Sequence, residues 1–113
     1  MSLRLERSSW FIGDLEHYAA WYTRKANWDL AERYLRAVAA TLRKIADLPT
    51  LGHRTRFAHP ELANLRCMRV ESPFQKHLIF YHWNETTVQA ERVVHGSRDL
   101  QERLRQAPGS DDY

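Results

Sequence analysis

Imidazole and guanidinium groups are concentrated in the second half of the sequence, where they could act together on a phosphodiester. A histidine whose pKa lies near neutrality can move a proton, and an arginine beside it can stabilise the negative charge that develops on phosphate. Residues that could cleave RNA in this way lie on or near the ends of adjacent predicted strands: His77, His82, His95, Arg69, Lys76 and Arg98. The alternative is that these are surface positions that are polar only because they face water, and residue type alone favours that interpretation.

Other catalytic chemistries find less support in the sequence. The four glycines are isolated, so the chain has no glycine-rich phosphate loop. The single cysteine, Cys67, excludes an intramolecular disulfide and lies in a predicted strand, where we expect a buried thiol rather than a nucleophile. His53 and His59 share one loop, but without a third ligand they do not predict a metal site. We therefore expect neither a metal nor a cofactor.

Length and charge limit the class of protein. The 113 residues predict one domain, assigned to residues 1–107, with a C-terminal tail at 108–113. The net charge of +3 is compatible with a polyanion or an acidic protein as partner. The N-terminal segment has no apolar core of signal-peptide length, and no apolar run is long enough to span a membrane. These features predict a cytoplasmic protein that makes no membrane contact.

The first half of the chain predicts a short strand followed by a helical hairpin. The segment "SLRLER" alternates leucine with polar residues, as a strand does, and Ser8 or Ser9 can then cap a helix. The apolar stripe of that helix consists of Phe11, Leu15, Tyr18 and Tyr22. A second helix should begin after Asn27, and its stripe consists of Ala31, Leu35, Val38, Leu42 and Ile45. The short break between the two helices predicts that they pack antiparallel.

The second half predicts a sheet and a C-terminal helix. After a loop come three candidate strands, at residues 65–71, 76–83 and 87–95. The middle strand is apolar on both faces, so we expect it to be central, with the helical hairpin over one face and the C-terminal segment or a partner over the other. Asp99 and Glu102 have the spacing of a capping box. The order of elements indicates an α+β fold in which a helical hairpin packs on a twisted antiparallel sheet.

Several stretches, in this order, resemble the RelE/ParE superfamily of toxins from bacterial toxin–antitoxin modules, and the ParE-like plasmid stabilisation proteins most closely. They are "DLEHYAAWY", "AERYLRAVAATLRKIADLPTLGHRTR", "ELANLRCMRV", "HLIFYHW" and "ERVVHGSRDL". The last is similar to a "V-x-H-G-A-R-D" ending, with Ser97 in place of alanine. The resemblance covers most of residues 14 to 100 and implies the same architecture. It also implies an antitoxin that folds on binding, with operator DNA contacted only through that antitoxin.

Members of the superfamily that this chain resembles differ in activity, because fold alone does not select a target. ParE-like members poison DNA gyrase, which is not an enzymatic activity, whereas RelE-like members cleave mRNA on the ribosome. Motif resemblance favours gyrase, and the target-binding residues would then be Arg66, Arg69, Lys76 and Arg98. For a ribonuclease, the catalytic residues would be His77, His95 and Arg98. A third hypothesis is a degenerate member that binds antitoxin but is not toxic.

Overall fold

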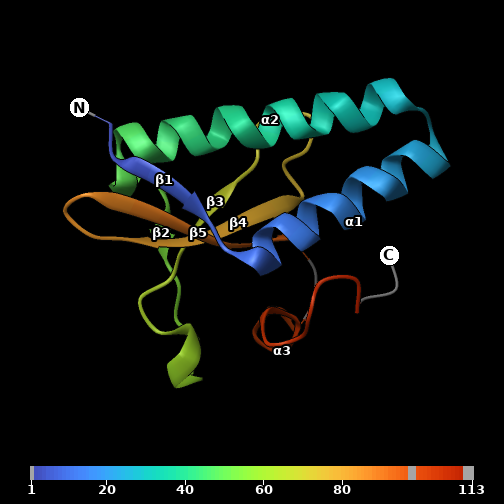
Figure 1. Cartoon of the computed structure of the whole chain (residues 1–113). Coiled ribbons are helices and arrows are strands. Elements are labelled where there is room, and N and C mark those ends of the chain that lie inside the picture. Colours follow the sequence, from blue (N-terminus) through green and yellow to red (C-terminus); the bar gives the residue numbers. More distant parts are fainter. Residues whose placement is uncertain (1, 97–98, 111–113) are drawn as a thin grey trace.

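A computed structural model describes residues 2–96 and 99–110, which form an α+β fold as the order of elements predicts. Along the chain the elements are β1 (Arg4–Arg7), α1 (Ser9–Lys25), α2 (Trp28–Asp47), β2 (His53–Arg54), β3 (Arg66–Arg69), β4 (His77–Trp83), β5 (Thr87–His95) and α3 (Leu100–Leu104). Short 3-10 helices lie at Pro49–Leu51 and Pro60–Leu62. Figure 1 shows α1 and α2 as a hairpin along one side of the sheet. Among the described residues, no helix is long and apolar enough to cross a bilayer.

Both long helices begin at the residues that the sequence marks as caps. The Ser8 side chain accepts a hydrogen bond from the backbone N–H of Phe11 at 3.0 Å, and the Asn27 side chain accepts one from the N–H of Leu30 at 2.8 Å. Each bond satisfies one of the donors that a helix N-terminus leaves without an intrahelical partner. The Ser8 hydroxyl also donates to the carbonyl of Glu91 at 2.7 Å, which fixes the start of α1 against β5.

The main core lies between the helical hairpin and one face of the sheet. Its α2 members are Tyr34, Val38, Leu42 and Ile45, all at most 1% exposed. The predicted stripe of α2 is therefore buried, except at Leu35, which is 39% exposed. One residue earlier, Tyr34 turns its ring inward instead, because the stripe of a straight helix drifts against a strict four-three repeat. Phe11 and Tyr18 of α1 complete the helical side of this core.

The sheet is mixed rather than purely antiparallel. Its strand order is β1-β5-β4-β3-β2, so the doubly apolar β4 is central, as predicted. The three inner pairings are antiparallel, whereas β1 pairs parallel with β5, with Arg4 beside Thr87. The segment expected to be a loop contains β2, which pairs His53 with Cys67 and Arg54 with Arg66. A strand of two residues has no periodicity that a sequence could reveal.

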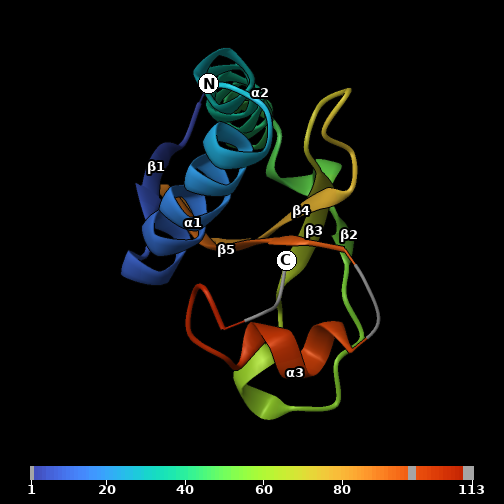
Figure 2. The same ribbon diagram turned by 90° about the vertical axis from the view of Figure 1, so that its right-hand side faces the viewer.

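The second face of the sheet is covered by the chain itself. Figure 2 shows α1 and α2 on one side of the sheet and α3 on the other. A second apolar cluster lies beneath α3 and consists of Leu62, Leu65, Cys67, Phe80, Val94 and Leu104. Of the two covers that the sequence allows for β4, the C-terminal segment is therefore the one present, together with the loop after β2.

The C-terminal segment departs from the prediction at the start of α3, and its end contacts α1. The helix α3 exists, but Asp99 has a left-handed φ of 60° and its side chain makes no capping hydrogen bond, so the capping box does not form. Pro108 and Gly109 lie against α1. A Cβ on Gly13 would stand 2.9 Å from Cγ of Pro108, so the close approach requires glycine there.

Candidate interaction surface

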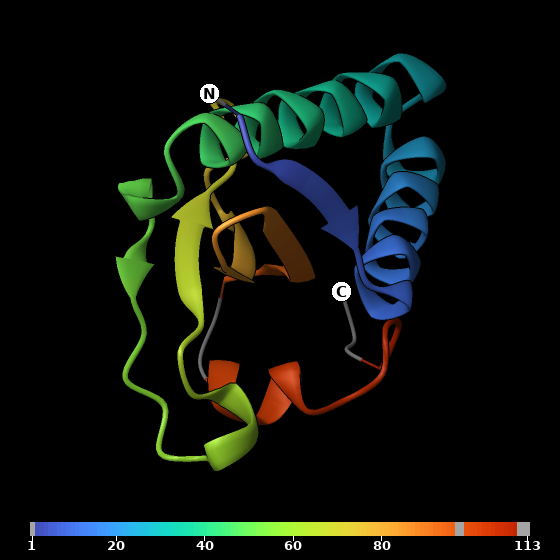
Figure 3. The ribbon, with the colours of Figure 1, turned by 60° about the vertical axis from the view of Figure 1, so that its left-hand side comes forward.

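A groove lined by cationic and apolar side chains lies on the α3 side of the sheet, near its β2 edge. Its volume is about 320 Å³. We call it the cationic groove, and its lining residues are His53, Arg54, Thr55, Arg56, Phe57, Cys67, Arg69, Leu78, Phe80 and Leu100. Figure 3 shows how β2 and the loop after it run beside β3 toward α3. The rim therefore comes from β2, its loop and β3, and the floor comes from β4 and α3.

The charges of this groove are not balanced by ion pairs within the described residues. None of its lining residues is acidic, and within the described chain no ion pair involves Arg54, Arg56 or Arg69. Other cations are neutralised locally, since Lys44 pairs with Glu71 at 2.5 Å and Arg36 pairs with Glu32. Like charges gathered in a concave surface create a positive potential that attracts anions.

Arg66 supports the groove from behind instead of lining it. Its Nη1 donates to the carbonyl of Gly52 at 2.7 Å, and the N–H of Gly52 donates to the Tyr81 hydroxyl at 2.9 Å. That hydroxyl donates in turn to the carbonyl of Pro49 at 2.6 Å. Burial raises the pKa of Tyr81, so the hydroxyl stays protonated and able to donate. This chain of hydrogen bonds fixes the entry to β2 and hence the position of Arg54.

His77 lies inside an aromatic cluster. It is 1% exposed and its Nε2 is 2.8 Å from the Tyr22 hydroxyl. The rings of Tyr18 and Tyr34 lie 4.8 and 4.6 Å away, and the half-buried His95 ring lies 5.2 Å away. Burial, with a smaller contribution from the charge of His95, lowers the pKa of His77 to about 3. The interpretation of His77 as a polar surface residue is therefore wrong.

The remaining predicted site residues are dispersed. Lys76 is exposed immediately before β4 and does not line the cationic groove. His82 is exposed and lies 3.1 Å from Glu91. Arg98 lies outside the described residues. Of the predicted target-binding residues that the structure describes, Arg69 lines the cationic groove with the basic residues of β2 and its loop, and Arg66 lies opposite Arg54 in the sheet but outside that lining. The alternating basic residues in "HRTR" were the signal that could have identified Arg54 and Arg56. Only the pairing of β2 with β3, in which Arg54 lies opposite Arg66, brings this segment to the strand of Arg69.

A buried ion pair connects three parts of the chain that sequence reasoning did not link. Arg92 donates from Nε and Nη2 to the Asp14 carboxylate at 2.7 and 2.8 Å. Its Nη1 donates to the carbonyls of Leu104 at 2.9 Å and Gln106 at 2.8 Å. Both partners are almost fully buried. Arg92 therefore attaches α1 and the C-terminal segment to β5, which is a structural role. The signal for Asp14 was its place three residues after Phe11, on the buried stripe of α1.

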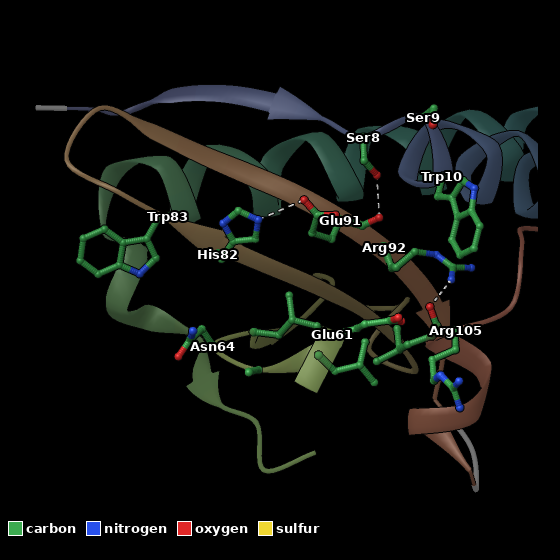
Figure 4. A pocket seen from close by; sticks show the side chains of 14 residues that line it. Ser8, Ser9, Trp10, Glu61, Asn64, His82, Trp83, Glu91, Arg92 and Arg105 are labelled. Atoms are coloured by element: carbon green, nitrogen blue, oxygen red, sulfur yellow. Dashed lines mark hydrogen bonds and ion pairs between the residues drawn. The ribbon is translucent and has the colours of Figure 1, made fainter. Parts of the chain in front are cut away.

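A larger groove of about 740 Å³ lies on the same face of the sheet, beyond α3 and the loop at 61–65. In Figure 4, Trp83 and Trp10 stand at opposite ends of it, and they are 40% and 41% exposed. Its charged groups are satisfied within the chain, since Glu91 pairs with His82 and Arg105 with Glu102. Although larger, it is lined by acidic as well as basic side chains, so its charge is less one-sided than that of the cationic groove.

Groups that could serve other chemistry do not converge. Burial, opposed in part by the charge of Arg69, raises the pKa of the Cys67 thiol to about 11, so the thiolate that a nucleophile requires is disfavoured. No group of three or more potential metal ligands exists among the described residues. His53 and His59, considered as ligands from the sequence, have no third partner in that part of the chain.

Comparison with known proteins places this arrangement in a class. The fold is that of a solved structure described as the chromosomal ParDE toxin–antitoxin system from P. aeruginosa, with a TM-score of 0.69 and 11% sequence identity over 85% of this chain and 98% of that chain. No curated protein matches the chain. The family model of the ParE toxin of the type II toxin–antitoxin system parDE matches residues 5–100. The chain therefore belongs to the ParE toxin family, as its motifs indicate.

Proposed function

We propose that this ParE-type toxin inhibits DNA gyrase and is neutralised by a cognate antitoxin. The observation that carries the proposal is the match of the ParE family model to residues 5–100, which includes every strand of the sheet except part of β1. The target surface would be the cationic groove, with Arg69, Arg54 and Arg56 making the main contacts. Lys76 and Arg98 stay predictions from the sequence, and Arg66 would act by positioning β2.

Cleavage of mRNA receives less support from the geometry. A general acid or base must come within hydrogen-bonding distance of the proton that it transfers. His77 is 1% exposed and surrounded by aromatic rings, so a phosphodiester cannot contact it without opening the cluster. Its lowered pKa also leaves it neutral near pH 7 and unable to act as an acid there. His95 remains the better placed of the two histidines.

The test uses the purified toxin in two assays run side by side. Supercoiling of relaxed plasmid by gyrase should fall as toxin is added and should recover when antitoxin is added. Translated mRNA on purified ribosomes should remain intact. If the toxin arrests growth but leaves supercoiling unchanged, gyrase is not the target. If expression without antitoxin leaves growth unaffected, the degenerate-member hypothesis replaces the proposal.

A further inference from the structure

We propose that two copies of this toxin associate through the outer edge of β1, so that their sheets join across a two-fold axis at Leu5. Among the described strands, β1 stands last on its side of the sheet and pairs with β5 alone. The occupant that we assign to its other edge is a second copy of this chain. The inference goes beyond the proposed function, since it concerns neither gyrase nor the antitoxin.

The backbone of β1 directs hydrogen-bonding groups to this edge. The N–H of Arg4 donates to the carbonyl of Thr86 and that of Ser8 to the carbonyl of Ala90, both at 2.9 Å, so the even-numbered residues face β5. Successive residues of a strand alternate in direction, which turns the N–H and C=O groups of Leu5 outward. Outward backbone groups on an edge strand are a template for a further strand.

The open part of this edge is short, which limits the overlap to residues 4–6 of each copy. On its N-terminal side, the N–H of Leu3 already donates to the carbonyl of Ala46 at 2.9 Å, at the end of α2. On its C-terminal side, α1 begins at Ser9. Figure 3 shows β1 at the front of the sheet, between the end of α2 and the start of α1. An interface of this size predicts a reversible dimer rather than a permanent one.

Charge selects one register of the joined strands. A two-fold axis at Leu5 pairs the two leucines by reciprocal backbone hydrogen bonds and places Arg4 of each copy opposite Glu6 of the other. Opposite charges directly across two strands attract, whereas like charges there repel. The next register with the same backbone directions has its axis at Glu6, and it would place the two glutamates opposite each other. The register centred on Leu5 is therefore favoured, because it has two attractive cross-strand pairs and no repulsive one.

The side chains of β1 are oriented for these contacts. Leu5 packs against the main core on the helical side of the sheet, so Arg4 and Glu6 stand on the opposite face. These two side chains are 74% and 53% exposed, and Nε of Arg4 lies 3.8 Å from Oε1 of Glu6. In the joined sheet the four charges alternate in sign around a square. An edge with charges of one sign repels a second copy, and the alternation on β1 removes that protection.

Charge reversal at this edge tests the inference. Sedimentation equilibrium of the purified toxin should show an average mass that rises with concentration toward twice the monomer mass. Arg4→Glu and Glu6→Arg should each weaken self-association by about tenfold or more, because each substitution places like charges opposite one another at two positions. Arg33→Glu, on the exposed face of α2, is the matched control and should change the dissociation constant by less than about twofold. Thermal melting of each variant establishes that it is folded.

Mixing the two variants separates the stated register from a general effect of net charge. In an equimolar mixture of Arg4→Glu and Glu6→Arg, one copy carries two carboxylates and the other carries two guanidinium groups at the facing positions. The mixture should therefore associate about as tightly as the parent protein. In the parent protein, hydrogen exchange at the backbone N–H of Leu5 should slow as the concentration rises, since that group becomes bonded in the dimer.

Three outcomes overturn the inference. The first is a parent protein that stays monomeric up to about 1 mM. The second is self-association that Arg4→Glu and Glu6→Arg leave unchanged, which would place the contact elsewhere on the surface. The third is a mixture of the two variants that associates no better than either variant alone. Inhibition of gyrase is measured in a separate assay, so each of these outcomes leaves the proposed function intact.

Discussion

Asp14 and Arg92, 78 residues apart in the sequence, form a buried ion pair in which two guanidinium nitrogens contact both carboxylate oxygens at 2.7 and 2.8 Å. The same carboxylate accepts the backbone N–H of Val93 at 3.1 Å, and the Arg92 guanidinium lies 5.0 Å from the ring centroid of Trp10. The third guanidinium nitrogen, Nη1, donates to two carbonyls of the C-terminal segment, so all three nitrogens of Arg92 have hydrogen-bond partners. The pair therefore connects both layers that cover β5.

Removing one partner of this pair should destabilise the fold strongly. In Asp14→Asn the guanidinium stays buried without its counter-charge, which should cost about 3–5 kcal/mol of unfolding free energy. Asp29→Asn, at an exposed position in the first turn of α2, should cost less than about 1 kcal/mol. Urea denaturation measures both. The double variant Asp14→Leu, Arg92→Met should be more stable than Asp14→Asn alone, and equal effects of Asp14→Asn and Asp29→Asn would show that the pair contributes little.

The apolar stripe on α2 predicts that substitutions on two neighbouring turns of this helix differ in their effect on stability. Val38 is 1% exposed in the main core and Leu35 is 39% exposed. Val38→Asp should unfold the domain, because it places a charge without a partner in the core. Leu35→Asp should cost less than about 1.5 kcal/mol, since its side chain already meets water. Circular dichroism of the two purified variants decides this, and a folded Val38→Asp would overturn the assignment of the core.

The helices were predictable because their signals are local. The caps Ser8 and Asn27 and the stripe of α2 each depend on residues within one or two turns, so pattern alone locates them. The direction of β1 was not predictable, because it depends on pairing with β5 some 80 residues later. For the same reason the candidate site was predicted only in part. Arg69 was chosen from its strand, but its gathering with Arg54 and Arg56 depends on a two-residue strand that pairs through tertiary structure.

The aromatic cluster predicts a specific loss of stability in acid. His77 has a pKa of about 3 in the folded protein, below the ordinary value of about 6.5 for the unfolded chain. The unfolded state therefore binds the proton more readily. The stability contributed by neutral His77 is fully present above pH about 6.5 and falls as the pH decreases toward 3, by a few kcal/mol in total.

This pH dependence can be separated from that of the carboxylates with one variant. In His77→Phe the ring still packs against Tyr18 and Tyr34, but no proton can bind at that position. The unfolding free energy from urea titrations should fall less steeply between pH about 6.5 and 4 in the variant than in the parent protein. The slopes of unfolding free energy against pH are compared, because loss of the hydrogen bond to Tyr22 lowers the unfolding free energy of the variant at every pH. Parallel curves would mean that His77 does not resist protonation.

Cys67 should be chemically inert in the folded protein. The thiol is 4% exposed and its pKa is raised to about 11, so only about one part in a thousand is thiolate at pH 8. Because it is the single cysteine, alkylation by iodoacetamide followed by mass spectrometry reports on it alone. Modification should be slow in buffer and fast in urea. Rapid modification of the native protein would show that the lining of the cationic groove at β3 opens to solvent.

The C-terminal segment bears on how any loss of toxicity must be interpreted. If the C-terminal segment contacts the target, truncation after Arg98 abolishes toxicity by removing those contacts. In the structure, that truncation also removes Leu104 from the second apolar cluster and two carbonyls from Arg92. We therefore expect the truncated chain to be destabilised, so its inactivity would not identify a target surface. Point variants that leave these contacts intact are the more informative choice.

Substitutions at Arg69 and His95 separate the two mechanisms. If the toxin binds gyrase through the cationic groove, Arg69→Ala should weaken inhibition of supercoiling by about 1–3 kcal/mol, since it removes one contact of several. His95→Ala should then change inhibition little, because no proton is transferred. If the toxin instead cleaves mRNA, His95→Ala should lower the cleavage rate at least about 10²-fold while the fold is retained. The proposal fails if ribosome-bound mRNA is cut by the parent protein and left uncut by His95→Ala, with supercoiling unaffected by either.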